Sequence, residues 1–150
     1  MEVLNNKEIN NTTGRHFLSD EDENFNAKLI YVSGISGFDK ILNDKTQNEI
    51  SAVIHLIKYK KGLMIRLAKN FKKYETAISL SDIKIIALEN QSEFFLLHIN
   101  TSNDKINFCC KNSHKDEMLK FISSLAIKPI IIQANRDSEY YNQIKKKYLR

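Results

Sequence analysis

Residues 77–110 read AISLSDIKIIALENQSEFFLLHINTSNDKINFCC, and this stretch decides the fold class. Three runs rich in apolar, β-branched and aromatic residues occupy positions 83–89, 93–100 and 105–110. Short polar segments separate these runs, and Ser81-Asp82 bends the chain before the first of them. Runs of this length that are bounded by turn residues predict strands joined by tight turns.

The same pattern continues towards the N-terminus. Lys60-Lys61-Gly62 is a predicted hairpin turn between two runs in which apolar residues recur at every second position. The mostly polar residues 39–49 are predicted to form a loop. Four further runs of this kind precede the three described above. The seven runs together predict seven short strands in meander order, which is typical of a mainly β antiparallel barrel or sandwich. The additional predicted strands cover 27–35, 50–56, 63–68 and 74–80.

A helix is predicted immediately after the last strand. Ser113 is a candidate N-cap, with Asp116 in the capping-box position, and Pro129 lies beyond the predicted end. The apolar residues between them recur at spacings of three and four, so they form one stripe that can pack on the sheet. Beyond it, an extended segment is expected at 129–134 and a short helix at 137–149. The stripe consists of Met118, Leu119, Phe121, Ile122, Leu125 and Ala126.

Composition excludes several classes of protein. The 150 residues are 42% hydrophobic and contain only two cysteines, which are adjacent, so neither a disulfide scaffold nor a cysteine-rich zinc site is expected. No apolar run approaches the ~20 residues of a membrane-spanning helix, and the polar start is not a secretory signal. Four glycines and the absence of G-x-S-x-G or H-E-x-x-H motifs predict no enzyme, cofactor or metal site. We therefore expect a soluble, cytoplasmic domain.

The net charge of +5 is unevenly distributed along the chain. Residues 1–26 carry −4, residues 27–128 carry +6 and residues 129–150 carry +3. The first segment is acidic, rich in Asn and poor in large apolar residues, so it is predicted to be flexible. The resulting division is a flexible N-terminal segment (1–26), a folded domain (27–127) and a basic C-terminal extension (128–150).

Four segments carry a resemblance to a known family. KLIYVSGISGF (28–38), AISLSDIKIIAL (77–88), FLLHINTSNDKINFCC (95–110) and HKDEMLKFISSL (114–125) resemble bacterial pleckstrin-homology-like proteins. The resemblance implies a seven-stranded antiparallel barrel capped by a C-terminal helix, used as a non-enzymatic platform for lipids, peptides or proteins. The Lys/Arg-x-Arg signature of phosphoinositide-binding members is absent from the second strand, which carries His55, Lys58 and Lys60 instead.

The most basic part of the chain is residues 58–73, here called the basic segment. It holds seven cationic side chains and no acid, with aromatic residues between them. Such a cluster attracts phosphate groups or acidic partners, and aromatic side chains can support a nucleic acid or a lipid headgroup. The alternative is a solvated strand edge, where lysines prevent unwanted pairing. The cations are Lys58, Lys60, Lys61, Arg66, Lys69, Lys72 and Lys73, and the aromatics are Tyr59, Phe71 and Tyr74.

Other charged or reactive groups leave alternatives open. The C-terminal cations Lys145, Lys146 and Lys147 lie on an amphipathic segment that fits either a membrane surface or the domain's own side. The run 20–23, DEDE, is read as a solvated tail, with cation binding or masking of the basic segment as alternatives. The four histidines have no metal-ligand spacing, and the two cysteines are predicted to face opposite sides of one strand.

These observations favour a non-catalytic binding module that contacts a protein or an anionic surface through the basic segment. Two other functions remain open: a peripheral membrane protein that binds anionic lipid, and a nucleic-acid-binding protein. All three depend on whether the lysines of residues 58–73 converge on one face or scatter along an edge.

Overall fold

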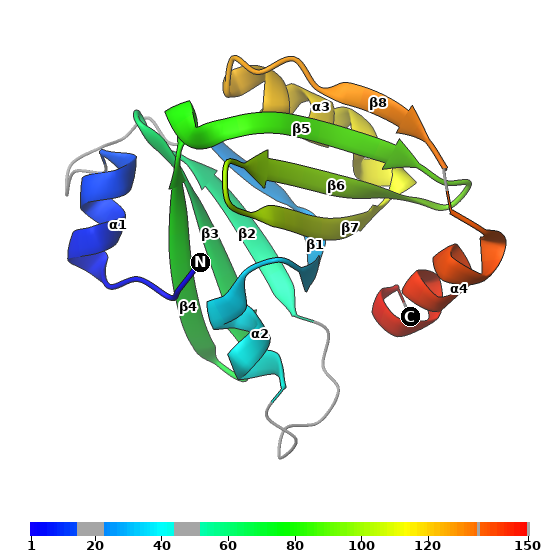
Figure 1. The fold of residues 1–150 in the computed structure, drawn as a ribbon, viewed down its shortest axis with the longest axis horizontal. Coiled ribbons are helices and arrows are strands. Elements are labelled where there is room, and N and C mark those ends of the chain that lie inside the picture. The colour runs from blue at the N-terminus through cyan, green and yellow to red at the C-terminus, as the bar shows by residue number, and fades with distance from the viewer. Residues whose placement is uncertain (15–22, 44–51, 135, 150) are drawn as a thin grey trace.

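The computed structural model describes residues 1–14, 23–43, 52–134 and 136–149, which form a mainly β protein (Figure 1). Eight strands build one sheet in the described residues. The bounds are β1 Glu23–Ser33, β2 Val53–Lys58, β3 Gly62–Lys69, β4 Lys72–Ser79, β5 Ile83–Asn90, β6 Phe94–Thr101, β7 Lys105–Lys111 and β8 Ile130–Gln133. The helices are α1 Asn6–Thr13, α2 Ser36–Leu42, α3 Lys115–Ser124 and α4 Ser138–Tyr148, with 3-10 turns at Leu80–Asp82 and Asn112–His114.

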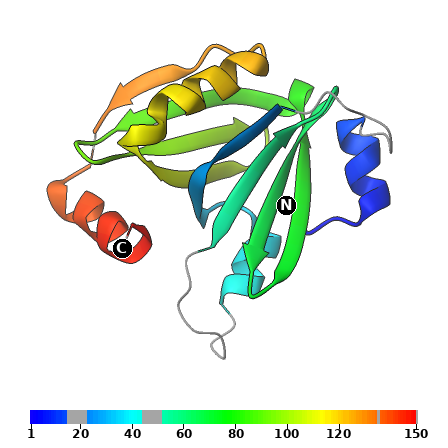
Figure 2. The same ribbon diagram turned by 180° about the vertical axis from the view of Figure 1, so that it is seen from behind.

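The strand order is β4-β3-β2-β1-β7-β6-β5-β8, so the sheet is open, with β4 and β8 at its edges. The predicted mainly β fold is confirmed, but the prediction of a barrel of seven antiparallel strands was wrong, because the sheet is not closed and has an eighth, parallel strand. An eighth strand forms because the chain that follows α3 returns to the free edge of β5 and pairs with it in parallel. The two halves of the sheet, β2–β4 and β5–β7, run in different directions, and α3 lies across the second half (Figure 2).

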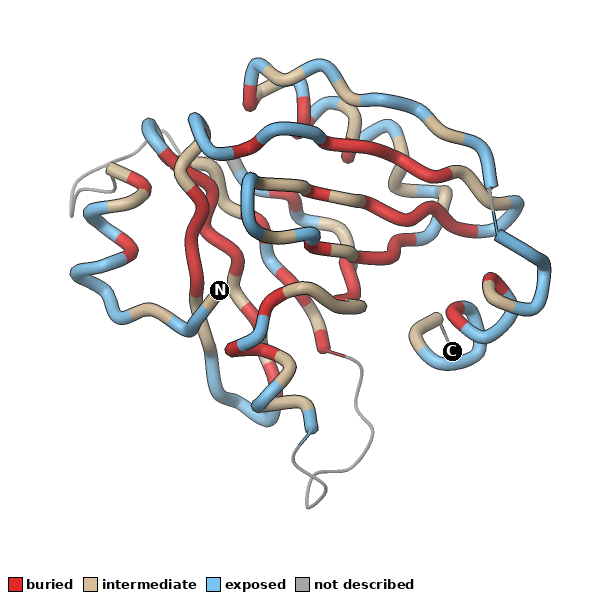
Figure 3. The backbone as a smooth tube through the Cα atoms, in the orientation of Figure 1, coloured by how far each residue is buried: buried red, intermediate tan, exposed pale blue. Residues whose placement is uncertain are grey.

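The main core fills the space between the two halves of the sheet. Its aromatic centre is Tyr31, whose ring lies 6.2 Å from Phe108 and 5.7 Å from Phe38. The helix α3 covers this core with Met118, Phe121, Ile122 and Leu125, so the predicted apolar stripe is confirmed for these four residues. Figure 3 shows the buried residues following the central strands and the exposed ones at the turns.

The start of α3 differs from the prediction. The 3-10 turn Asn112–His114 precedes the helix, the N-cap is His114, and no side chain makes a cap hydrogen bond, so the capping box of Ser113 and Asp116 was wrong. The helix ends at Ser124 because Ala126 adopts a left-handed conformation with φ 58°, well before Pro129.

Residues 39–42, predicted to begin a loop, belong to α2, which is anchored by the buried ring of Phe38. The Tyr31 hydroxyl donates to the Asp39 carboxylate at 2.6 Å and accepts from the Ile35 amide at 2.7 Å. Tyr31, only four residues before Ile35, therefore fixes the helix start through side-chain contacts that the mostly polar composition of residues 39–49 does not reveal. The rest of that predicted loop, residues 44–49, lies outside the described residues.

Residues 1–14, predicted to be flexible, instead contain the helix α1, which packs on the outer face of β3 and β4. The Asn5 side chain accepts from the Glu8 amide at 2.9 Å, and Glu8 accepts from the Asn5 amide, which completes a capping box. Ile9 is fully buried against Met64 and its neighbours. A Cβ on Gly62 would lie 2.8 Å from the Thr12 carbonyl oxygen, so glycine at this position permits the close approach.

The C-terminal extension belongs to the same folded unit. The predicted short helix is confirmed as α4, whose N-cap Asp137 accepts from the Tyr140 amide at 2.9 Å. Tyr141 and Ile144 are buried against Ile30, Leu96 and neighbouring residues on the outer face of the second half-sheet. Of the two alternatives left open for this segment, the structure shows the helix packed on the domain's own side.

Candidate functional site

The basic segment does not form one surface. Its first three lysines lie at the β2–β3 turn, and its last three lie at the β3–β4 turn, at the two ends of the eight-residue strand β3 (Figure 1). With a rise of about 3.3 Å per residue, the two turns are roughly 25 Å apart along the strand. The seven cations therefore cannot act on one phosphate group.

At the β2–β3 turn, several groups of the basic segment are already used for packing. The Lys58 ammonium donates to the Ser124 carbonyl oxygen at 2.6 Å, which ties β2 to the end of α3. Tyr59 is buried, so it is not available for stacking on a base. The Lys61 backbone donates to the Thr13 carbonyl at 2.8 Å. Lys60 and Lys61 are nevertheless exposed at the surface.

In the middle of the segment, Arg66 forms an ion pair with Glu75, with 3.0 Å between Nε and Oε2. These residues are direct cross-strand neighbours, so the pair supports the sheet and neutralises the arginine. Tyr74 is partly buried against the main core. Lys69 is only 7% exposed, which removes most of its side chain from the surface.

The β3–β4 turn has an unusual composition for its geometry. Its two central residues, Asn70 and Phe71, have φ values of 51° and 65°, so both are left-handed, as in a type I′ hairpin turn. Glycine is strongly favoured at the second of these positions, because a side chain there costs about 1 kcal/mol or more. Phe71 occupies this position with its ring fully exposed.

Two exposed lysines stand directly behind the exposed ring. Lys72 and Lys73 are the first residues of β4, and neither has a carboxylate partner among the described residues. Consecutive strand residues point to opposite faces of a sheet, so one lysine flanks the turn on each side. We call Phe71, Lys72 and Lys73 the hairpin tip.

The C-terminal cations are dispersed around α4. Lys145 forms an ion pair with Glu93, and the Lys147 ammonium lies 5.1 Å from the centre of the Tyr148 ring. Lys146 is exposed at the surface, although it is not free of contacts with the rest of the protein. This helix therefore adds positive charge to its own surface without joining the hairpin tip. The acidic residues 20–22 lie outside the described residues, so masking of the basic segment stays a prediction.

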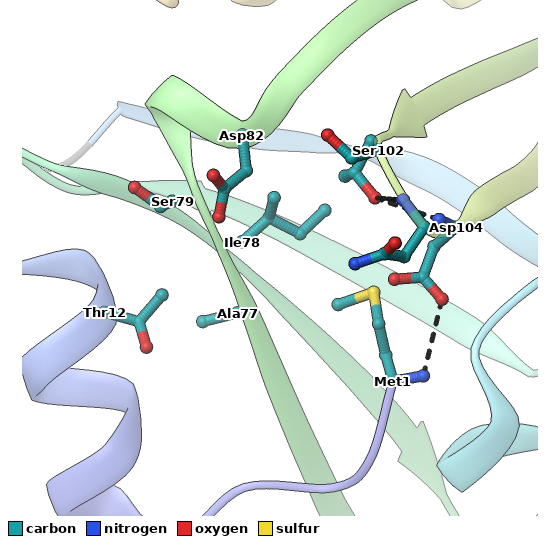
Figure 4. Close-up of a pocket in the computed structure, with 10 residues that line it drawn as sticks. Met1, Thr12, Ala77, Ile78, Ser79, Asp82, Ser102 and Asp104 are labelled. Carbon is teal, nitrogen blue, oxygen red and sulfur yellow. Dashed lines mark hydrogen bonds and ion pairs between the residues drawn. The ribbon is translucent and has the colours of Figure 1, made fainter.

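A cavity of about 370 Å³ lies between α1, the end of β4 and the β6–β7 turn (Figure 4). Its lining includes the carboxylates of Asp82 and Asp104, and the amino group of Met1 lies 3.5 Å from Asp104. Acidic side chains on two sides of the cavity disfavour an anionic ligand. Within the described residues, no three histidine, cysteine or carboxylate side chains gather as metal ligands.

A second cavity, of about 260 Å³, lies on the outer face of β1, β6 and β7, beside the chain that enters α4. His98 lies at its base, with Nδ1 2.6 Å from Asn107 Oδ1. A histidine inside a strand between apolar residues is more often a hydrogen-bonded structural residue than a metal ligand, and this contact shows that His98 is hydrogen-bonded. The other histidines in the described residues are not in this cluster: His55 is exposed, and His114 lies 3.7 Å from Glu117.

The two cysteines face opposite sides of β7, as predicted, but both are buried. Cys110 lies in the main core, and Cys109 lies beneath α4 instead of facing solvent. Burial raises the pKa of each thiol to about 12, and the two sulfurs interact unfavourably when Cys109 ionises. Neither thiol is therefore suited to act as a nucleophile near neutral pH.

The raised thiol pKa values predict a loss of stability in alkali. Unfolded thiols ionise near pH 9, whereas the folded ones ionise only near pH 12. The folded state therefore holds more protons between these values, so the stability present below pH 9 decreases as the pH rises towards 12. Denaturant melts between pH 9 and pH 12 should show the decrease in the free energy of unfolding. In a separate test, a thiol reagent that labels both cysteines in guanidinium should not label the native protein at pH 8. Rapid labelling of the native protein would contradict the burial.

No family model matches the chain, and no curated protein sequence matches it. Among solved structures, the chain is similar to the hSac2 domain from human phosphoinositide phosphatase Sac2, with a TM-score of 0.45 and 11% sequence identity. The superposition covers 81% of this chain and 83% of the Sac2 chain. A similarity of this extent assigns no function.

None of the described helices has the length and apolar character needed to cross a membrane.

Proposed function

We propose that this protein is a non-catalytic, pleckstrin-homology-like module that binds anionic membrane surfaces through the hairpin tip. The observation that carries the proposal is the fully exposed Phe71 in a left-handed turn, followed by two exposed lysines. An aromatic ring of this kind partitions into the headgroup region, and cations behind it attract anionic lipids. The run of seven antiparallel strands followed by an amphipathic helix supports the pleckstrin-homology-like assignment.

The arrangement of the tip favours a membrane over a nucleic acid. A nucleic-acid surface needs a groove or sheet face along which phosphates and stacked bases can follow one another. Here the ring projects from the end of a hairpin, the lysines flank it on both sides, and Tyr59, at the other end of β3, is buried. A flat surface that is approached end-on fits this geometry.

The expected binding is weak and reversible. Burial of one phenylalanine side chain contributes about 1.5–3 kcal/mol, and each lysine near an anionic surface contributes about 1 kcal/mol. Their sum is close to the free energy of a millimolar dissociation constant, about 4 kcal/mol. The tip therefore orients the domain on a membrane and needs a second contact, or several copies, to hold it there.

The test compares two charge-matched double variants. Lys72→Gln with Lys73→Gln removes the tip cations and should weaken binding to phosphatidylserine-containing vesicles about 30-fold, since two lysines contribute about 2 kcal/mol. Lys60→Gln with Lys61→Gln removes the same charge from the other end of β3. Vesicle co-sedimentation should show the loss only for the first pair, with wild-type binding falling as salt increases.

Equal losses for the two double variants would show that net charge alone drives the binding and would overturn the assignment to the tip. Retention of single-stranded oligonucleotides, with no binding to anionic vesicles, would overturn it in favour of a nucleic-acid-binding protein.

A further inference from the structure

The geometry points to a second binding site, for a phosphate monoester, in the 260 Å³ cavity between β1, β6, β7 and the entry to α4. The proposed membrane contact at the hairpin tip does not involve this cavity, and neither proposal depends on the other. The polar side chains that face the cavity are those of Ser33, His98, Asn100, Lys105, Asn107 and Arg136.

A directional chain of hydrogen bonds lies along the base of the cavity. His98 Nδ1 lies 2.6 Å from Asn107 Oδ1, and Asn107 Nδ2 donates to Ser33 Oγ at 3.0 Å. Because the Asn107 amide nitrogen is the donor to Ser33, its oxygen is left to accept from the histidine. On its other side, His98 Nε2 lies 3.8 Å from the carboxylate of Glu89, which is almost fully buried and is not among the residues that line the cavity.

The chain of hydrogen bonds ends on the Ser33 hydroxyl, and Ser33 lines the cavity. The Ser33 oxygen accepts from Asn107 Nδ2, so the hydroxyl hydrogen of Ser33 can be donated to a ligand oxygen in the cavity. Successive hydrogen bonds polarise one another in the same direction, so this hydroxyl is a favourable donor towards the cavity. Its natural partner is an electron-rich oxygen atom of a ligand.

Two cations complete the donor set. Lys105 is exposed at the start of β7, and Arg136 is exposed just before α4, where its guanidinium lies 5.3 Å from the centre of the Tyr140 ring. Neither forms an ion pair within the described residues, and no carboxylate lines the cavity. Two cations against the one buried carboxylate behind His98 leave the surroundings of the cavity positive, which favours an anion.

The local backbone brings two of these donors together. Gly34 follows Ser33 with a φ of 106°, and a Cβ at this position would lie 2.0 Å from the Lys105 carbonyl oxygen. Only glycine allows the end of β1 to approach the start of β7 so closely, and Ser33 and Lys105 both line the cavity beside this contact. The site is thus built into the turn after β1.

The shape and size of the cavity favour a small phosphate ester. The donors come from three separate segments, which suits a tetrahedral group with several acceptor oxygens, and an arginine can hold two of them at once. The volume lies just below the usual range for ligand pockets, about 300–1,000 Å³, which limits the ligand to a compact molecule. The source is either a soluble metabolite or the headgroup of a phosphomonoester lipid, because both present the same group.

Phosphate titrations of the folded protein test the site. We expect inorganic phosphate and glycerol 3-phosphate to shift the amide signals of Ser33, Lys105 and Asn107, with sodium chloride at equal ionic strength as the reference. Arg136→Gln should weaken this binding at least about tenfold, because hydrogen bonds to charged groups are among the strongest. Lys84→Gln removes one exposed cation from β5, outside the cavity, and should leave the affinity unchanged.

The remaining outcomes are also decisive. Binding to phosphatidic acid vesicles alone, lost in Arg136→Gln, would identify a lipid headgroup as the source of the phosphate. Equal affinities of the wild type, Arg136→Gln and Lys84→Gln would mean non-specific screening of surface charge and would overturn the site. Because phosphate in solution is measured without vesicles, a negative result here leaves the hairpin-tip proposal unaffected.

Discussion

Replacement of Phe71 by glycine is expected to stabilise the fold and to abolish membrane binding at the same time. Phe71 has a φ of 65°, and Asn-Gly is the preferred pair for a two-residue turn in which both residues are left-handed. Phe71→Gly should therefore raise the free energy of unfolding by about 1 kcal/mol, measured by denaturant melts. It should also weaken vesicle binding about 10- to 100-fold, because the apolar contribution of the ring is lost.

The matched variant is Phe71→Leu, which keeps an apolar side chain in the same strained conformation. It should bind vesicles nearly as well as the wild type and gain no stability. Opposite changes in stability and binding are expected where a residue has been retained for function at a structural cost. If Phe71→Gly bound vesicles like the wild type, the exposed ring would have no part in membrane contact.

Truncation of Ile9 to alanine is expected to destabilise the protein by about 2–4 kcal/mol, although it lies in a segment whose composition suggests disorder. Ile9 is fully buried and packs with Tyr59, Met64 and Ala77 on the outer face of β3 and β4. Its loss leaves a cavity under α1 and weakens the docking of the helix. Denaturant melts should show the loss, and amide exchange should accelerate throughout α1.

Lys7→Ala is the control on the same helix, because Lys7 is exposed and should change stability by less than about 0.5 kcal/mol. Equal stabilities of Ile9→Ala and the wild type would mean that α1 does not contribute to the folded state. In that case, the reading of residues 1–14 as a flexible tail would be correct.

The regular β pattern could be predicted from the sequence because alternation is a local property. The strands β5, β6 and β7 begin and end within one residue of the expected positions, and the bend at Ser81-Asp82 is a 3-10 turn. The parallel strand β8 could not be recognised as the eighth member of the sheet, since its partner β5 lies about forty residues earlier in the chain. Its pairing depends on the path of the chain across α3.

The helices α1 and α2 were missed because each is fixed by the tertiary contacts of a few side chains. Ile9 and Thr13 are the buried residues of α1, and Tyr31 fixes the start of α2 through its hydroxyl. Neither segment has an apolar stripe long enough to predict a helix. In both cases, tertiary packing overrides a weak local preference.

The candidate sites, like the helices, depend on tertiary contacts that the local sequence does not reveal. The basic segment is continuous in sequence, but a hairpin reverses direction at each turn, so its lysines separate to the two ends of β3. The exposure of Phe71 could have been suspected from its place between Asn70 and two lysines in a predicted break between strands. The group formed by Ser33, His98 and Asn107 could not, because it requires β1 to pair with β7, which brings Ser33 to Asn107, 74 residues later in the chain.

The most direct test of the hairpin tip uses the absence of tryptophan from this chain. Phe71→Trp provides a single fluorescent reporter at the tip, and Ser92→Trp places one in the exposed β5–β6 turn as a control. On phosphatidylserine vesicles with brominated acyl chains, the emission of the first variant should shift to shorter wavelengths and be quenched, while that of the control stays unchanged. An unshifted, unquenched signal from Trp at position 71 in vesicle-bound protein would contradict membrane contact through the hairpin tip.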